Sequence, residues 1–164
     1  MKKKVAIYPG TFDPITIGHM DIIKRASDIF DKVIIAIAVS TDKKPMFSLK
    51  QREKMVKIAT SDLKGVEIKT FDTLLVDFAK EMNTNIILRG LRAVSDFEYE
   101  LQLSYANSSL DPKIETVFLM PSLENAFISS TVVRAILKHD GPVSHLVPKE
   151  ILPLLNRDSD VYSI

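Results

Sequence analysis

The chain has 164 residues, of which 46% are hydrophobic and 26% are charged, as is ordinary for a soluble globular protein of one domain. A net charge of +1 argues against nucleic acid as a partner, and the lack of cysteine excludes disulfides and thiolate metal sites. The longest apolar run, Val33–Val39, is too short to span a bilayer, and the basic start Met1–Lys4 leads into an apolar run that breaks at Pro9. We therefore expect no signal peptide and no membrane partner, and we predict a cytoplasmic protein.

Short apolar runs alternate along the chain with stretches of helical periodicity. Two of the runs are almost continuously apolar, as in strands buried on both faces. Ser48 and Gln51 have the spacing of a capping box at a helix start. In chain order, we predict a strand over Val5–Tyr8, a helix over His19–Phe30, a strand over Val33–Val39, a helix capped by Ser48, a strand over Val66–Thr70, a helix over Leu74–Met82, a strand over Asn85–Leu88, a helix over Phe97–Leu110, a strand over Thr116–Met120, a helix from Ser129 or Ser130 to about Lys138, and a short helix from Pro148.

This alternation predicts one doubly wound, Rossmann-like α/β domain over residues 1–164, with a five-stranded parallel sheet and helices on both faces. Ligands of such folds bind beyond the carboxyl ends of the strands. The loops at that end are 9–18, 40–47, 71–73, 89–95 and 121–130, and they hold most of the unusual polar residues.

The loop after the first strand has neither a dinucleotide-binding fingerprint nor a P-loop pattern. Gly10 and Gly18 bracket it instead, and both could let the backbone approach a ligand closely. His19 follows at the predicted helix start, where free N–H groups favour an anion. A helix-start histidine whose ring packs on Phe12 or faces solvent is the alternative interpretation.

Two arginines directly after the fourth strand are costly to place unless an anion neutralises them. These are Arg89 and Arg92, and the alternative is pairing with acidic residues of the next helix, which are Asp96, Glu98 and Glu100. Lys43, in the loop after the second strand, is explained either by a ligand or by a solvated basic turn.

The loop after the fifth strand ends in Ile128-Ser-Ser-Thr-Val-Val-Arg134. Its serines could be simple helix caps, or they could hold phosphate oxygens together with the helix N–H groups. All of these loops meet at one edge of the predicted sheet, and together they predict a site for several phosphates. Its candidate residues are Thr11, His19, Lys43, Arg89, Arg92, Ser129, Ser130 and Arg134.

Two of these segments resemble the signature motifs of the nucleotidyltransferase superfamily. Thr16-Ile-Gly-His19 resembles the T/H-x-G-H motif, and Ile128 to Arg134 resembles I-S-S-T-x-x-R. The longer strings YPGTFDPITIGH, KKPMF, LRGLRAVSDFEYE and VFLMPS resemble bacterial phosphopantetheine adenylyltransferases along essentially the whole chain. The chain departs from the usual family pattern at Ala135, often a glutamate, and at Asn125-Ala126, often a pair with an aromatic residue.

The resemblance implies transfer of AMP from ATP to 4'-phosphopantetheine, which gives dephospho-coenzyme A and pyrophosphate with Mg²⁺ as cofactor, in a homohexamer. It implies His19, Lys43 and Arg92 as catalytic residues. It implies an ATP site formed by Thr11, Phe12, His19, Gly90, Leu91, Arg92, Glu100, Asn125, Ala126, Phe127, Ile128, Ser129, Ser130 and Thr131. It implies a pantetheine-phosphate side formed by Thr11, Lys43, Leu75, Arg89 and Asn107.

An ionised acceptor phosphate needs no general base, so we expect catalysis by positioning and charge stabilisation. His19 would then donate to the α-phosphoryl group. Mg²⁺ would sit mainly on phosphates and water, so we name no protein ligand for it. Two alternatives remain open: a nucleotidyltransferase for another small phosphorylated acceptor, and a non-catalytic nucleotide-binding domain.

Overall fold

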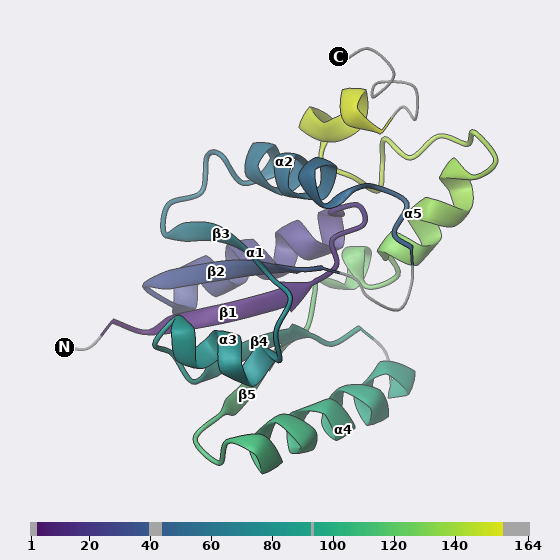
Figure 1. The fold of residues 1–164 in the computed structure, drawn as a ribbon. Helices are drawn as coiled ribbons and strands as arrows, with labels where there is room; N and C mark the ends of the chain where they lie inside the picture. The colour runs from purple at the N-terminus through teal and green to yellow at the C-terminus, as the bar shows by residue number, and fades with distance from the viewer. Residues whose placement is uncertain (1–2, 40–43, 93, 156–164) are drawn as a thin grey trace.

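The computed structural model describes residues 3–39, 44–92 and 94–155 and has an α/β architecture (Figure 1). Five parallel strands form one sheet in the order β3-β2-β1-β4-β5. The predicted five-stranded parallel sheet is therefore confirmed. In chain order the elements are β1 (Val5–Gly10), α1 (Ile17–Ile29), β2 (Lys32–Ala38), α2 (Leu49–Ala59), β3 (Val66–Phe71), α3 (Leu75–Glu81), β4 (Ile86–Gly90), α4 (Val94–Leu110), β5 (Glu115–Leu119), the 3-10 helix η1 (Leu123–Asn125), α5 (Ser130–Leu137) and the 3-10 helix η2 (Lys149–Leu154).

Each face of the sheet has its own apolar core, because successive side chains of a strand point to opposite faces. On one face, residues such as Tyr8 and Ile35 pack with α1, α2, α5 and η2. On the other, residues such as Ile7 and Ile34 pack with α3. Helix α4 lies beside α3 and the edge strand β5 (Figure 1). Helices thus cover both faces, as predicted.

Several predicted boundaries were wrong. Strand β1 continues through Pro9 to Gly10, because both residues still pair with β2 although the β4 side is no longer paired there. Helix α1 begins at Ile17, two residues before the predicted start, since Thr16 caps it. Helix α4 begins at Val94, earlier than predicted, and η1 was not predicted at all. The segment after Pro148 forms a 3-10 helix, and Pro148 is its N-cap.

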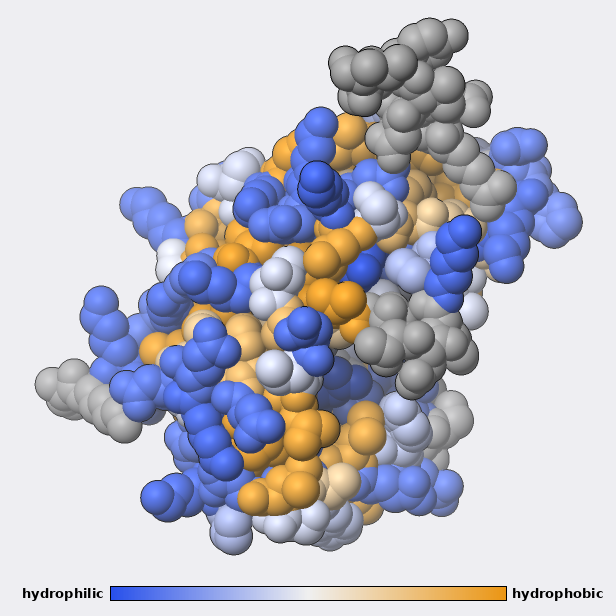
Figure 2. Space-filling view, in the orientation of Figure 1, coloured by the Kyte–Doolittle hydropathy of each residue, from blue (hydrophilic) through white to orange (hydrophobic). Residues whose placement is uncertain are grey.

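Hydrophilic side chains cover much of the face seen in Figure 2, but apolar surface is visible over α3 and the neighbouring α4. Within the residues that the structure describes, no helix is both long and apolar enough to cross a membrane.

Candidate active site

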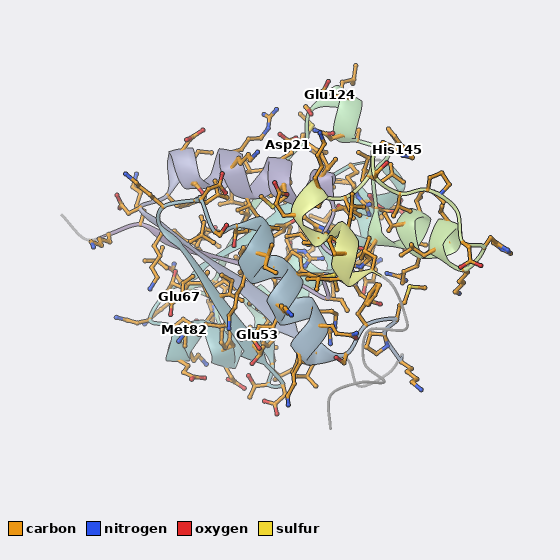
Figure 3. All side chains as sticks on the ribbon, turned by 90° about the horizontal axis from the view of Figure 1, so that it is seen from above. Asp21, Glu53, Glu67, Met82, Glu124 and His145 are labelled. Carbon is orange, nitrogen blue, oxygen red and sulfur yellow. The ribbon has the colours of Figure 1, made fainter. Side chains whose placement is uncertain are left out.

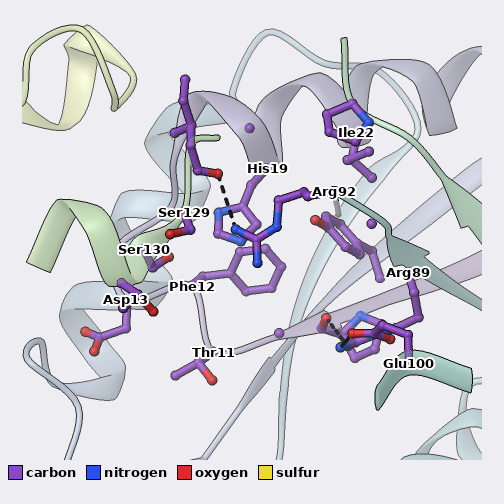
Figure 4. Close-up of a pocket in the computed structure, with 18 of the residues that line it drawn as sticks. Thr11, Phe12, Asp13, His19, Ile22, Arg89, Arg92, Glu100, Ser129 and Ser130 are labelled. Carbon is purple, nitrogen blue, oxygen red and sulfur yellow. Dashed lines mark hydrogen bonds and ion pairs between the residues drawn. The ribbon is translucent and has the colours of Figure 1, made fainter. Parts of the chain in front are cut away.

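The candidate site lies where β1 and β4 separate at their carboxyl ends. The two strands pair only at Ala6 and Ile7 of β1, so the last three residues of β1 have no β4 partner. The connections from β1 and β4 also run to opposite sides of the sheet, which makes this gap the topological switch point. A pocket of about 300 Å³ opens there (Figure 4).

Most of the predicted site residues meet in this pocket. Those that line it are Thr11, Phe12, His19, Arg89, Gly90, Arg92, Glu100, Ile128, Ser129, Ser130, Thr131 and Arg134. Leu91 and Phe127 are chain neighbours of lining residues but do not line the pocket themselves, and Asn125 and Ala126 do not line it either. Leu75 on α3 and Asn107 on α4 do not line the pocket either. Lys43 lies outside the residues that the structure describes.

His19 is held in the first turn of α1 by a reciprocal pair of hydrogen bonds. Its backbone N–H donates to Oγ1 of Thr16 at 3.2 Å, and its ring Nδ1 accepts the backbone N–H of Thr16 at 3.1 Å. This is a capping box with histidine in the place usually taken by glutamate or glutamine. Nδ1 is therefore an acceptor, and in the neutral ring the proton sits on Nε2. The packing of the ring on Phe12, at 4.9 Å between ring centroids, confirms that part of the alternative interpretation.

The environment keeps this imidazole neutral. Burial, assisted by the positive charges of Arg92 and Arg89, lowers the pKa of His19 from 6.5 to about 3. Near pH 7 the ring therefore carries one proton, on Nε2, and offers a hydrogen-bond donor rather than a base. Figure 4 shows His19 above Phe12, with the Arg92 side chain beside it in the pocket.

Arg89 forms the main ion pair of the site. Its Nε and Nη2 donate to the two carboxylate oxygens of Glu100 at 2.7 and 2.6 Å, and its Nη1 donates to the Pro9 carbonyl at 3.2 Å. Burial lowers the pKa of Arg89, but the Glu100 carboxylate more than offsets this, so that the pKa is raised overall. Pairing with an acidic residue of the next helix is thus confirmed for Arg89. Because the Glu100 carboxylate balances the charge of the guanidinium, the pair brings little net positive charge to the pocket.

Arg92 is more available to a ligand than Arg89 is. Its side chain is 39% exposed, its Nε lies 3.5 Å from the Asp96 carboxylate, and its Nη1 donates to the Ile128 carbonyl at 3.5 Å. Both contacts are long, so a phosphate could replace them at little cost. Arg92 is consequently the better candidate for binding an anionic ligand.

The serines at the start of α5 have different partners. Ser129 is the N-cap, and its Oγ accepts the Val132 N–H at 3.2 Å, which confirms its role as a cap. Ser130 donates its hydroxyl to the Pro14 carbonyl at 2.7 Å. Its hydroxyl proton is thus already used, and the first N–H groups of the helix are better placed to receive an anion. Arg134 donates to the Asp13 carbonyl at 2.8 Å, so it joins α5 to the β1–α1 loop.

The start of α1 also positions the loop after β5. A Cβ on Gly18 would lie 2.9 Å from the Ile128 carbonyl, so the close approach predicted at this glycine is to another backbone segment. At Gly10 a Cβ would meet the Phe12 ring at 3.0 Å.

Asp21, one turn after Gly18 on α1, also holds the loop after β5. Its carboxylate accepts the Ser122 N–H at 2.6 Å, and Figure 3 shows Asp21 close to η1, which carries Glu124. The remaining histidines, His139 and His145, are exposed.

Sequence reasoning missed Arg52 and Asp13. Arg52 is 1% exposed, and its guanidinium donates to the carbonyls of Thr11, Ala38 and Phe47, of which Thr11 lines the pocket. Asp13 is 3% exposed and accepts the backbone N–H groups of Met46 and Phe47. A signal for Arg52 existed, because it lies on the buried face of α2 at helical spacing from Met55.

The donor set fits a magnesium ion held by a substrate better than one held by the protein. The described residues contain no group of three or more histidine and acidic side chains that could hold a metal. Of the two carboxylates that line the pocket, Glu100 is paired with Arg89, and Asp13 is engaged by two backbone N–H groups. Phosphates and water would therefore supply most ligands of such an ion.

Comparison with known proteins gives a consistent result. The cytidylyltransferase-like family model matches residues 7–136. The phosphopantetheine adenylyltransferase of Nautilia profundicola is 65% identical over 147 residues, which cover 90% of this chain and 96% of that protein. The enzyme of that name from Wolinella succinogenes is 60% identical over 154 residues, which cover 94% of this chain and 96% of that protein. The one from Helicobacter pylori strain G27 is 57% identical over 155 residues, which cover 94% of this chain and 99% of that protein. The chain therefore belongs to the cytidylyltransferase-like family and, within it, to the phosphopantetheine adenylyltransferases.

Proposed function

We propose that the protein transfers the AMP moiety of ATP to the phosphate of 4'-phosphopantetheine, forming dephospho-coenzyme A and pyrophosphate as a step of coenzyme A biosynthesis. Family membership supports this reaction. In the structure, the observation that carries it is the neutral His19 ring, whose Nδ1 is occupied by Thr16 and whose Nε2 is left as a donor in the pocket.

In this reaction an oxygen of the acceptor phosphate attacks the α-phosphorus of ATP in line. The bond from that phosphorus to the oxygen bridging to the β-phosphate breaks, and pyrophosphate leaves. The acceptor oxygen is already ionised, so no base is needed, and catalysis rests on positioning and on stabilising the charge that develops. A neutral histidine with a pKa of about 3 suits the role of donor to the α-phosphoryl oxygens.

The other roles follow from position. Arg92 and the start of α5 would bind the β- and γ-phosphates, because residues of both line the same pocket and the contact of Arg92 with the Ile128 carbonyl is long. Thr11, directly after β1, and Arg89, near the end of β4, would bind the acceptor phosphate, together with Lys43. Leu75 and Asn107 would contact the pantetheine arm outside the pocket. Mg²⁺ bound to the phosphates would neutralise their charge.

Pyrophosphate release from ATP tests this proposal. We expect release with 4'-phosphopantetheine, but not with pantetheine, glycerol 3-phosphate or nicotinamide mononucleotide. CTP in place of ATP should support little turnover. A chelator should stop the reaction, and added Mg²⁺ should restore it. Equal turnover with the other phosphorylated acceptors would contradict the assigned acceptor, and no turnover with any of them would favour a non-catalytic nucleotide-binding domain.

We also propose that the chain acts as a cytoplasmic homohexamer, as the family resemblance implies. Helix α4 supports self-association. Its apolar side chains are distributed around the helix, and several are exposed although they are large: Phe97, Tyr99, Leu103, Tyr105 and Leu110. A helix with this much exposed apolar surface is typical of an interface between proteins.

A further inference from the structure

We infer that Arg52 is a positioning residue for adenylyl transfer: its buried guanidinium joins the β1–α1 loop of the active site to the end of β2 and the start of α2. This inference rests on the proposed reaction. It concerns a residue outside the pocket lining, which reaches the reacting groups only through the backbone.

The guanidinium connects three points that are far apart in the chain. Nη1 donates to the Thr11 carbonyl at 2.7 Å and to the Ala38 carbonyl at 2.9 Å. Nε donates to the Phe47 carbonyl at 3.2 Å. Thr11 lines the pocket, whereas Ala38 ends β2 and Phe47 precedes α2. One planar donor group thus determines the spacing between the pocket loop and both of these segments.

A second set of hydrogen bonds also joins the β1–α1 loop to the segment before α2. The Asp13 carboxylate accepts the N–H groups of Met46 and Phe47 at 2.8 and 2.9 Å. The Asp13 carbonyl accepts Nη1 of Arg134, which belongs to α5. The β1–α1 loop is therefore held from the α2 side by Arg52 and from the α5 side by Arg134.

The pocket depends on this arrangement because Thr11, Phe12 and Asp13, which belong to this loop, line it. Phe12, between the two anchored residues Thr11 and Asp13, adopts a positive φ of 49°, a conformation that non-glycine residues seldom adopt without support. Its ring packs against His19 and Tyr8. Loss of the Arg52 anchor would release Thr11 and so allow Phe12 and His19 to shift. A misplacement of about 1 Å can lower a rate about 10²-fold.

Two substitutions at Arg52 and a matched control separate positioning from plain stability. Arg52→Lys keeps the positive charge but lacks the planar guanidinium with its several N–H donors. Arg52→Met keeps a side chain of similar length but has no hydrogen-bond donor. Met55→Ala removes a side chain that is 0% exposed on the same helix and belongs to the apolar core, so it should lower stability without moving the loop. All variants are compared well below their melting temperatures, by steady-state pyrophosphate release, calorimetric ATP binding and hydrogen–deuterium exchange.

We expect both Arg52 variants to bind ATP nearly as the parent does and to lose about 10- to 100-fold in kcat. Amide exchange should rise in peptides covering residues 9–16 and 44–48, whereas Met55→Ala should keep the parental kcat. Arg52→Lys decides the result if Arg52→Met does not fold. A folded Arg52 variant with parental kcat and parental exchange in these peptides would overturn the inference. A parent enzyme without activity would instead contradict the proposed function, and the exchange data would still test the anchor.

Discussion

The backbone N–H of Thr16 donates to Nδ1 of His19 at 3.1 Å. One hydrogen bond thereby links the folding of a helix start to the chemistry of a side chain, because it completes the cap of α1 and also fixes which ring nitrogen carries the proton. Thr16 is fully buried, so water does not compete for the bond.

The first prediction concerns stability and pH. The pKa of His19 is lowered in the folded protein to about 3, whereas an unfolded histidine titrates near 6.5. Between these values the unfolded state binds one more proton at this residue than the folded state does. The free energy of unfolding should therefore fall as the pH falls through this window, by at most about 1.4 kcal/mol per pH unit.

His19→Gln isolates this contribution, since glutamine can complete the capping box but does not titrate. Urea unfolding of parent and variant between pH 7 and pH 4 measures the difference. The parent should lose more stability than the variant on acidification. Parallel curves would mean that the folded histidine titrates normally.

The second prediction concerns the Arg89–Glu100 pair. Arg89→Ala leaves the Glu100 carboxylate, which is only 8% exposed, without its partner, and should cost about 3 kcal/mol of stability. The same change should raise the KM for 4'-phosphopantetheine strongly and leave ATP binding mostly intact. The double variant Arg89→Met, Glu100→Gln should recover most of the stability but not the acceptor KM. If ATP affinity collapsed while the acceptor KM stayed parental, the two subsites would be assigned the wrong way round.

The third prediction concerns assembly. Light scattering of the parent should report about six times the monomer mass of 18.4 kDa. Leu110→Lys on α4 should shift the protein to smaller species, because it places a charge on a side chain that is 56% exposed in the single chain. Ile29→Lys is the control, with a similar exposure of 54% but on α1. Equal masses for the two variants would show that α4 does not form the interface, and a monomeric parent would refute the hexamer.

Local patterns were sufficient to predict the alternation of elements and the edge of the sheet where the site lies. The start of α1 was placed at His19, two residues late, because histidine stands where a capping box usually has glutamate or glutamine, and Thr16 was therefore not recognised as the N-cap. The predicted strand β1 ended too early, at Tyr8, because a proline such as Pro9 usually ends a central strand. Pro9 can remain in β1 because the strand no longer pairs with β4 at this residue, and that separation depends on the whole sheet.

Contacts between distant segments limited the prediction of the site. Three acidic residues were candidates for pairing with the arginines, and only the course of α4 decides that Glu100 meets Arg89 while Asp96 meets Arg92. Arg52 lies on the buried face of α2, but its three carbonyl partners come from segments up to 41 residues away. Local periodicity in the sequence cannot predict that these distant segments lie next to one another.

The fourth prediction separates the two roles of His19. His19→Ala removes both the ring donor and half of the capping box, and we expect a loss of about 1 kcal/mol in stability. His19→Gln should restore that stability but only part of the turnover, because its amide can bond to Thr16 yet lacks the rigid ring that aims Nε2–H into the pocket. Thermal unfolding and pyrophosphate release, measured on the same samples, test whether the capping role and the catalytic role of His19 are separate. Turnover that followed stability in both variants would contradict it.

On the proposed mechanism, Nε2–H of His19 stabilises the α-phosphoryl group mainly in the transition state. Calorimetric ATP binding combined with the kcat of pyrophosphate release for His19→Ala tests it most directly. We predict ATP affinity within about tenfold of the parent and a kcat lower by about 10²–10³, the usual effect of losing one such donor. A kcat near the parental value in the folded variant would contradict the account and leave His19 as a helix-capping residue.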